Sequence, residues 1–426
     1  IYCENLPAIR LEDNIPSWII PYRYFTLSSY KSWKEVNEWA QSVFAIKDKP
    51  ELDDVFEEIF TGNETTEQKI SKLINYVQDD IRYMGIESGI GSIKPFSPEQ
   101  VVKQRFGDCK DKSLLLVWLL KYIGIEKAYP VLVNTVLQNE VDKHFASNQV
   151  FNHCIVTFEY NNDTFWVDPT IAQQGGDFSD MFTYNYGKAL IVGLPADSLH
   201  KMSINNKEGM TSYVNEFKFI SFTEPGQLLI KSVRNGINAD IQRSLMEYFS
   251  IKDISDKLTN DLKLQFPIVN KTDEAVIEDN VEENSFAITY NYEVDGLWID
   301  GDNETNQALK GLWIFRFEPQ TLYGYINKTV CEEREFNYEL NYPENIHYRV
   351  VFNFPKDMLT FDHYKNYDNK AFYFEEKAEQ LNSRSLQIDY RYRTKENFIK
   401  AADYKKICEQ KNDIVTKLPI VIYFPK

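Results

Sequence analysis

The sequence predicts an α+β protein, with a core of helices packed on an antiparallel sheet and a β-rich C-terminal region of the β-sandwich type. Apolar residues follow helical spacing from about residue 32 to 125 and alternate with a period of two after about residue 128. Tyr and Phe number 27 and 28 among 426 residues, which favours strands. A chain of this length is expected to form more than one domain.

Three parts are expected along the chain. Residues 1–40 carry several prolines and form an extended leader, the tail of a β-rich domain that would lie upstream. Residues 41–205 form the core. Residues 206–426 form the β-rich C-terminal region, as one or two sub-domains.

Helix starts are marked by local side-chain patterns. Ser32 and Thr65 are each followed three residues later by Glu or Gln, the pattern of a capping box. Ser97 is followed by Pro98 at a first helical position, and we expect this short helix to end at Gly107. Asp108 is then a good N-cap for a helix over residues 109–122, which is apolar most of the way round and therefore central and buried.

Strands follow this helix. We expect them at residues 130–133, 151–160 and 164–168, with a hairpin turn at 161–163 and a loop-rich segment at 171–200. The C-terminal region is mostly strand-like, interrupted by one or two helices, at 240–249 and in the stretch after it, and by a polar helix at 394–415. Its expected strands are 215–222, 228–233, 286–292, 312–317, 348–354, 371–375 and 386–392.

Composition excludes several classes of function. The net charge of −17, without a basic stripe, argues against nucleic acid as a partner. No segment reaches the roughly 18 apolar residues of a membrane-spanning helix. The five cysteines are too far apart for a dense disulfide framework or a CxxC metal site, so at least one thiol should be free. Phosphate-loop and HExxH patterns are missing too.

Cys109 is the candidate nucleophile. At the first position of a helix its sulfur lies among free backbone N–H groups, which stabilise a thiolate. Lys110 and Lys112 should add positive potential, whereas Asp108 and Asp111 oppose it. The alternative is a small buried thiol at a helix–sheet junction. We favour the functional interpretation because a His and an Asp lie on the following strands.

His153 is the candidate base. Alternation places His153 and Ile155 on one face of their strand, and Cys154 with the apolar residues that alternate with it on the other. We expect the end of the Cys109 helix to pack on the His153 face. The alternative is a hydrogen-bonded core histidine. His144, in a polar loop, is the nearest rival and is expected to be solvated.

Asp168 is the candidate orienting carboxylate. The hairpin places it level with Ile155, as a diagonal neighbour of His153 and within reach of its ring. The alternative is a common Asp-Pro turn starter. The backbone N–H of Cys109 is the natural donor to an oxyanion, and Gln104 or Tyr83 could supply a second.

Three motifs in this order carry a family resemblance: Gly-Asp-Cys-Lys-Asp-Lys-Ser at 107–113, Asn-His at 152–153 and Trp-Val-Asp-Pro-Thr at 166–170. They resemble the bacterial transglutaminase-like superfamily of papain-like thiol enzymes, and segments 81–87 and 95–106 fit the same pattern. The resemblance covers about residues 40–200. The leader and the β-rich end look like the flanking domains of large envelope-associated members.

The resemblance implies a nucleophile at Cys109, a general base at His153 and its orienter at Asp168, with no metal and no organic cofactor. It also implies a periplasmic or secreted location and a protein, peptide or cell-wall substrate. We expect acyl transfer through a thioester, with hydrolysis favoured over amine cross-linking because water needs no dedicated pocket. Two alternatives are a scaffold that keeps only the fold, and carbohydrate binding by the aromatic-rich strands, which sheet cores explain more simply.

Overall fold

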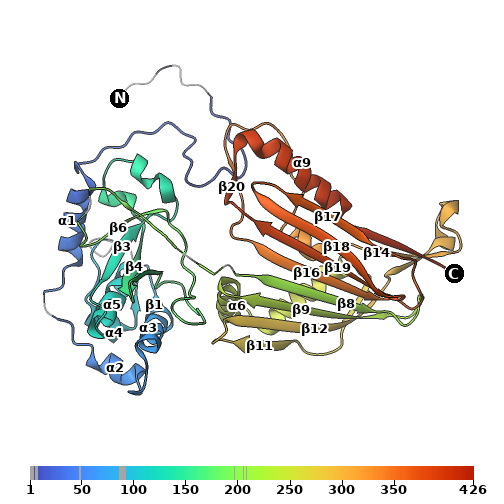
Figure 1. The fold of residues 1–426 in the computed structure, drawn as a ribbon, viewed down its shortest axis with the longest axis horizontal. Coiled ribbons are helices and arrows are strands. Elements are labelled where there is room, and N and C mark those ends of the chain that lie inside the picture. Colours follow the sequence, from blue (N-terminus) through green and yellow to red (C-terminus); the bar gives the residue numbers. More distant parts are fainter. Residues whose placement is uncertain are drawn as a thin grey trace. The chain divides into compact units, whose positions relative to one another are not determined.

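The computed structural model describes residue 4 and residues 8–47, 49–85, 93–195, 197–204, 206–207 and 209–426. Cys3, and parts of the predicted leader and of the 81–87 motif, lie outside these residues. The chain divides into two units (Figure 1). Unit 1 comprises residues 1–11, 17–207 and 281–284, and unit 2 comprises residues 12–16, 208–280 and 285–426.

Unit 1 begins with helices and continues with strands, as the change in periodicity predicts. Its helices are α1 (Trp33–Phe44), α2 (Asp53–Ile59), α3 (Thr66–Asn75), the π-helical turn η1 (Tyr76–Asp80), α4 (Pro98–Gln104) and α5 (Cys109–Tyr122). Short 3-10 turns cover Gln138–Lys143 and Asn148–Val150. The strands are β1 (Arg82–Tyr83), β2 (Phe106–Gly107), β3 (Ala128–Val133), β4 (His153–Tyr160), β5 (Asp163–Val167), β6 (Lys188–Ile191) and β7 (His200–Lys201).

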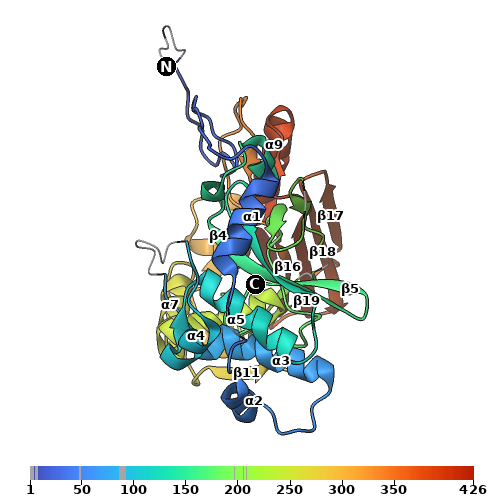
Figure 2. The ribbon, with the colours of Figure 1, turned by 90° about the vertical axis from the view of Figure 1, so that its left-hand side faces the viewer.

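An antiparallel sheet in the order β5-β4-β3-β6-β7 is the frame of unit 1. Helices α1, α3 and α5 gather on one side of this sheet (Figure 2). Val156 and Phe158 of β4 pack there against the leucines of α5, and Leu132 packs against α1. Val131 and Ile155 form a smaller core on the opposite face. The Cys109 helix is therefore a buried central element, as predicted.

Unit 2 is built on one large sheet in the order β10-β12-β9-β8-β16-β19-β18-β17, with β11 also paired to β12. All its pairs are antiparallel except the parallel β8–β16 pair. The strands are β8 (Thr211–Lys218), β9 (Gly226–Asn235), β10 (Ile268–Lys271), β11 (Val276–Asn280), β12 (Ser285–Asp295), β16 (Asn345–Asn353), β17 (His363–Asp368), β18 (Phe372–Asn382) and β19 (Ser385–Thr394).

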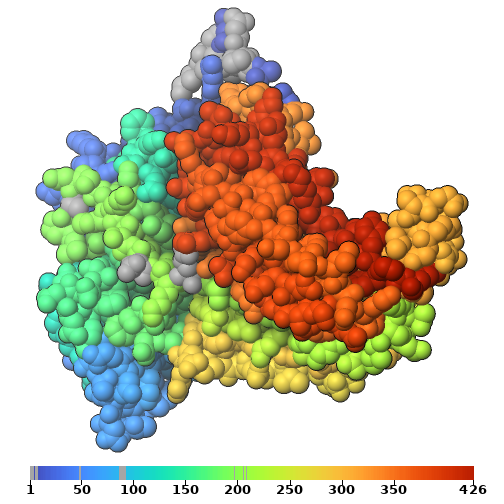
Figure 3. Space-filling view, turned by 45° about the vertical axis from the view of Figure 1, so that its right-hand side comes forward, coloured from blue at the N-terminus to red at the C-terminus, as the bar shows by residue number. Residues whose placement is uncertain are grey.

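One hydrophobic core joins this sheet to the other elements of unit 2. A three-stranded sheet of β13 (Trp298–Asp300), β14 (Leu312–Phe317) and β21 (Ile420–Pro425) packs on it through edge-to-face contacts between phenylalanine rings. The β-rich C-terminal region is thus confirmed. The remaining elements are α6 (Ile237–Tyr248), α7 (Ile251–Lys263), α8 (Gln320–Tyr323), β15 (Tyr338–Glu339), β20 (Phe398–Ile399) and α9 (Ala401–Lys417). The orange-to-red surface of Figure 3 is formed by the last strands and α9.

Several element boundaries differ from the prediction. Helix α4 ends at Gln104 and not at Gly107, because Arg105 adopts a left-handed conformation (φ 60°) and the chain then pairs with β1. Helix α9 begins at Ala401 and not at residue 394, because β19 stays paired through Thr394. The segment 171–200 contains strand β6, which pairs with β3 through long-range contacts.

Three features complete the description. Cys331 and Cys408 form a disulfide in unit 2, whereas Cys109 and Cys154 are free and buried. Among the described helices none is long and apolar enough to cross a membrane. No group of three or more His, Cys, Asp or Glu side chains that could hold a metal ion occurs in the described parts of the chain.

Candidate active site

Helix α5 starts with a complete capping box that fixes the position of Cys109. The Asp108 carboxylate accepts hydrogen bonds from the backbone N–H groups of Lys110 (2.8 Å) and Asp111 (3.1 Å). In return, the Asp111 carboxylate accepts from the backbone N–H of Asp108 (2.9 Å). Gly107 is required here because a Cβ at this position would lie 2.7 Å from the Cβ of Asp111. Cys109 is consequently held at the first helical position, with 4% of its surface exposed.

The imidazole of His153 links the thiol to the carboxylate. Its Nε2 lies 2.7 Å from Oδ2 of Asp168, and the ring also forms a hydrogen bond with the Cys109 thiol. His153 is the first residue of β4 and faces Val133 of β3 in register. Val156 pairs with Val167, which places Asp168 directly beyond the paired part of β5 and level with Ile155. The structure therefore brings the three predicted residues together.

The two faces of β4 carry the residues that alternation predicts, but the position of the Cys109 helix differs from the prediction. Helix α5 packs on the face that carries Cys154, Val156 and Phe158, and not on the His153 face. Val156 and Phe158 on that face pack against the leucines of α5, whereas the opposite face, which carries Ile155, packs into a separate apolar core. His153 meets Cys109 from the end of the strand, beside the first turn of the helix.

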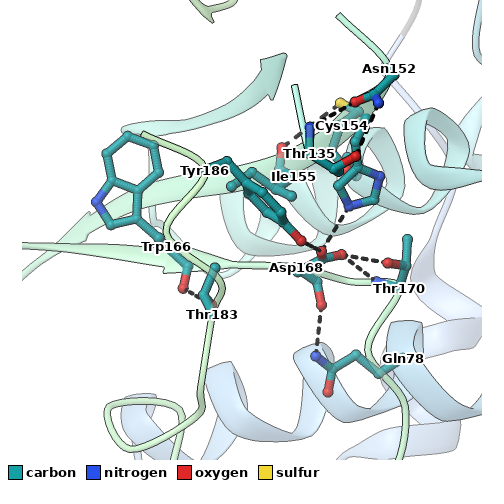
Figure 4. Close-up of polar contacts among 12 residues, drawn as sticks. Gln78, Thr135, Asn152, Cys154, Ile155, Trp166, Asp168, Thr170, Thr183 and Tyr186 are labelled. Atoms are coloured by element: carbon teal, nitrogen blue, oxygen red, sulfur yellow. Dashed lines mark hydrogen bonds and ion pairs between the residues drawn. The ribbon is translucent and has the colours of Figure 1, made fainter. Parts of the chain in front are cut away.

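Asp168 is buried, and both of its carboxylate oxygens accept hydrogen bonds. Its exposed fraction is 2%, and its Oδ2 accepts a second hydrogen bond from the Tyr186 hydroxyl (2.9 Å). Its Oδ1 accepts from both the backbone N–H (2.9 Å) and the hydroxyl (2.6 Å) of Thr170. The Gln78 side chain donates to the Asp168 carbonyl oxygen (3.0 Å), so the backbone is held as well (Figure 4). Because these hydrogen bonds fix the position of the carboxylate, the carboxylate in turn fixes the orientation of the imidazole.

These contacts favour a charged imidazole. Burial by itself lowers the pKa of His153, but the hydrogen bonds to Asp168 and Cys109 outweigh it and raise the pKa to about 10. For Asp168, burial acts to raise the pKa, and the bonds from His153 and Thr170 reverse this and lower it. Burial and the Asp168 carboxylate raise the pKa of Tyr186, which stays a neutral donor. An imidazolium therefore lies between sulfur and carboxylate at neutral pH.

The two lysines after Cys109 are used differently from the prediction. Lys110 forms an ion pair with Asp108 (2.6 Å), so its charge is locally compensated. Lys112 is completely buried and donates to the carbonyl oxygens of Gln78 (3.1 Å) and Ile81 (2.8 Å) at the end of η1. Burial lowers the pKa of Lys112 to about 8. Lys112 thus joins α5 to the preceding helices.

A cavity of about 270 Å³ opens beside Cys109 and His153. The described residues that line it are mainly apolar and amide side chains: Trp39, Phe44, Ile93, Cys109, Lys110, Leu132, Asn148, Gln149, Phe151, Asn152 and His153. The Asn152 side chain is already paired with Thr135. The cavity gives a carbonyl group access to the sulfur.

Gln104 and Tyr83, the predicted additional oxyanion donors, are not among these lining residues. The Gln104 amide donates to the carbonyl oxygen of Phe106 (2.7 Å), because α4 ends at this residue and its side chain satisfies the following turn. Tyr83 lies on the edge strand β1 with 48% of its surface exposed. Neither residue is among those that line the cavity at Cys109, so a role as oxyanion donor stays a prediction.

Sequence reasoning missed three residues that hold the site: Tyr186, Thr170 and Gln78. Thr170 could have been found, because a Thr two residues after an Asp commonly closes a turn onto its carboxylate. Tyr186 lies in the segment predicted to be loop-rich, and Gln78 lies on the polar side of a helical pattern. Neither position has a local signal that points to Asp168.

A helix-borne thiol, packed beside an antiparallel sheet that carries an imidazole and a carboxylate, defines a papain-like core of the transglutaminase type. The sequence profile described as "Transglutaminase-like superfamily" matches residues 53–169, the segment that contains all three site residues. The chain therefore contains a transglutaminase-like core. No curated protein matches the chain.

A solved structure has a similar fold along most of the chain. It is the crystal structure of a "putative protease" from Parabacteroides distasonis ATCC 8503, with a TM-score of 0.52 and 8% sequence identity. The similarity covers 93% of this chain and 59% of that one, so this chain spans less than two thirds of the length of the protein it resembles. At this identity the likeness concerns the fold alone.

Proposed function

We propose that this protein is a cysteine-dependent hydrolase of peptide or carboxamide bonds. Cys109 is the nucleophile, His153 the general base and acid, and Asp168 the group that orients the imidazole. The sulfur attacks the substrate carbonyl, and the backbone N–H of Cys109 stabilises the oxyanion. The imidazolium then protonates the leaving amine, which departs and leaves a thioester. The now neutral His153 takes a proton from water as the water oxygen adds to the thioester carbonyl. The C–S bond then breaks, the carboxylic acid product leaves, and the pair of sulfur and imidazolium is restored.

One observation carries this proposal: the His153 ring is hydrogen-bonded on one side to the Cys109 thiol and on the other to a buried carboxylate 2.7 Å away. The capping box and three further hydrogen bonds to the Asp168 carboxylate hold this arrangement in place, and a cavity adjoins it. A protein that kept the fold for scaffolding alone would not need such a constrained chain of groups.

The lining of the cavity supports water as the acceptor. Its described residues include one cation, Lys110, and no carboxylate that would attract a protonated amine. Apolar side chains such as Trp39, Phe44 and Phe151 offer contacts to an apolar group of the substrate. We therefore propose hydrolysis, with a protein, peptide or cell-wall substrate, as preferred over amine cross-linking.

We also propose that the protein works in the periplasm or outside a bacterial cell. The Cys331–Cys408 disulfide supports this, because such bonds persist in oxidising compartments and are rare in the cytosol. The structure with the similar fold comes from a bacterium, which agrees with this proposal.

The proposal is tested by cysteine-resolved alkylation together with hydrolysis of a peptide library in heavy-oxygen water. We expect Cys109 to be the reactive thiol and the heavy oxygen to enter new carboxyl termini. Cys109→Ser should abolish cleavage. His153→Ala should slow cleavage by about 10²- to 10⁴-fold and also slow alkylation of Cys109.

His144→Ala is the matched control, because His144 stacks on Tyr24 and has no part in the proposed chemistry. It should behave like the wild type. If an added primary amine is incorporated in place of heavy oxygen, the reaction is amine cross-linking and the proposal of hydrolysis is wrong. An unreactive Cys109, or equal rates for the wild type and His153→Ala, would instead favour the scaffold.

A further inference from the structure

Unit 2 contains a second and larger cavity, of about 560 Å³, within the range that holds small organic ligands. Its floor is the inner face of β8, β9, β12 and β16, and its opposite wall is formed by α7 and α8. Its lining residues all belong to unit 2: Tyr213, Asn215, Ile230, Ser232, Arg234, Ile254, Lys257, Leu258, Asp261, Leu262, Leu264, Gln265, Tyr290, Gln320, Thr321, Tyr323, Gly324 and Tyr348.

Polar residues interrupt the core at this place. Further along the same inner face the strands carry Phe217 and Phe352, which are fully buried. At the cavity the face changes to Asn215 and Ser232, with exposed fractions of 7% and 5%. The Asn215 side chain donates to the Tyr348 hydroxyl (2.9 Å) and the Ser232 hydroxyl accepts from Arg234, so the cavity has a hydrogen-bonded polar lining where the apolar core ends.

The cavity wall is held firmly but leaves apolar surface uncovered. Helix α7 is anchored by the Thr259 hydroxyl, 3.2 Å from that of Tyr292, and by Gln265, whose side chain donates to the Glu318 carbonyl oxygen (2.8 Å). Leu258 and Leu262 face the cavity and are only partly buried by protein. The wall therefore offers an apolar body a surface to cover.

Arg234 supplies a positive charge in the lining of this cavity that is unpaired among the described residues. Its Nη1 donates to the Ser232 hydroxyl (3.0 Å), and its guanidinium lies over the ring of Tyr213 at 5.9 Å. None of the described carboxylates forms an ion pair with it, whereas the other lining cation, Lys257, is paired with Asp261 (2.7 Å). One guanidinium with free donors suits a single negative charge, and its planar fork suits a carboxylate.

We propose that this cavity binds a small organic monocarboxylate with an apolar or aromatic body. The carboxylate meets Arg234, and the body lies between the tyrosines of the sheet and the leucines of α7. This site is separate from the Cys109 chemistry, and the proposal does not rest on the proposed function.

Isothermal titration calorimetry on the full chain tests it, with 4-phenylbutyrate as the probe and 4-phenylbutanamide as its uncharged counterpart. We expect saturable binding of the acid, and binding of the amide about tenfold weaker or worse. Arg234→Gln should weaken binding of the acid by a similar factor, so that the protein no longer prefers the acid over the amide. Leu258→Trp, which fills the cavity, should prevent binding of both.

Arg316→Gln is the matched control, because Arg316 is exposed on β14 outside the cavity, and it should bind like the wild type. Protein alkylated at Cys109 should also bind unchanged, which separates this site from the first cavity. The proposal is overturned if the acid shows no saturable binding up to about 10 mM, or if acid and amide bind equally. It is also overturned if Arg234→Gln folds normally by circular dichroism and binds the acid like the wild type.

Discussion

His153 carries its positive charge because two partners hold its ring at once. The Asp168 carboxylate contributes more to the raised pKa than the Cys109 thiol does. Each partner also has its own support, the carboxylate from Tyr186 and Thr170, and the thiol from the first turn of α5. The charge on the imidazole is therefore a property of the site as a whole, which makes its pKa a direct measure of assembly.

A nuclear magnetic resonance titration of the His153 ring should show this. In the wild type we expect a midpoint near pH 10. Asp168→Asn keeps the shape of the side chain but removes its charge, so the midpoint should fall the furthest. Cys109→Ser should lower it less. The His144 signal is the internal control and should not differ between variants, while a wild-type midpoint near the unperturbed value of about 6.5 would contradict the assembled site.

The same raised pKa predicts how stability depends on pH. The folded protein binds the proton of His153 more tightly than the unfolded chain does. The contribution of this proton to the unfolding free energy is therefore complete below about pH 6.5 and is lost as the pH rises through about 10. The difference in unfolding free energy between the wild type and His153→Gln should therefore shrink from about pH 6 to about pH 10. Urea unfolding measures it, and a difference that grows with pH would be incompatible with an imidazolium in the folded state.

At the scale of elements, the start of α5 decides where the nucleophile lies. The Asp108 cap binds two backbone N–H groups and also holds the Lys110 ammonium. Helix α3 has an equivalent capping box, formed by Thr65 and Gln68, far from the site in sequence. The two helices therefore allow a matched comparison, in which one cap supports the nucleophile and the other only a helix.

Asp108→Ala should lower the unfolding free energy by about 1–2 kcal/mol and slow alkylation of Cys109, because both the helix end and the sulfur lose their support. Thr65→Ala should cost about 1 kcal/mol and leave alkylation unchanged. Urea unfolding and cysteine-resolved mass spectrometry give the two readouts. If both variants slowed alkylation equally, the effect would be one of general stability and not of the Asp108 cap.

Local signals explain which elements the sequence could predict. The capping boxes at Thr65 and Asp108 and the hairpin between β4 and β5 depend on neighbours within a few residues, so their patterns are visible in the chain. The packing face of β4 depends on α5, and the contact of Tyr186 with Asp168 depends on a strand pairing, β6 with β3, made over a long distance in sequence. Tertiary packing determines both features, and neither produces a local pattern in the sequence.

At the scale of the molecule, too, local patterns could be predicted from the sequence and long-range pairing could not. Alternating residues predicted most strands of unit 2, but not that β8 pairs in parallel with β16, more than a hundred residues later. Each unit has hydrophobic clusters of its own: among the residues that the structure describes, one cluster lies in unit 2 and three lie in unit 1. Apart from two short segments, the division between the units falls near residue 207. Separate cores imply that each unit can respond to a change on its own.

The disulfide tests that independence. Cys331 and Cys408 close a loop with a sequence separation of 77 within unit 2, so the double variant Cys331→Ser and Cys408→Ser should destabilise unit 2 by about 2–5 kcal/mol. Unit 1 contains neither cysteine, and its unfolding should change little. Calorimetry should show one transition moving to lower temperature and another staying in place, with the alkylation rate of Cys109 at a lower temperature unchanged.

Cys154→Ser is the matched control, because it removes a buried thiol from unit 1 without touching the disulfide. It should shift the other transition, the one that stays in place in the double variant. Hydrogen exchange read by mass spectrometry assigns each transition to its unit. If the double Ser variant lowered both transitions together, the two cores would unfold as one cooperative body, and the disulfide would stabilise the Cys109 site through the whole chain.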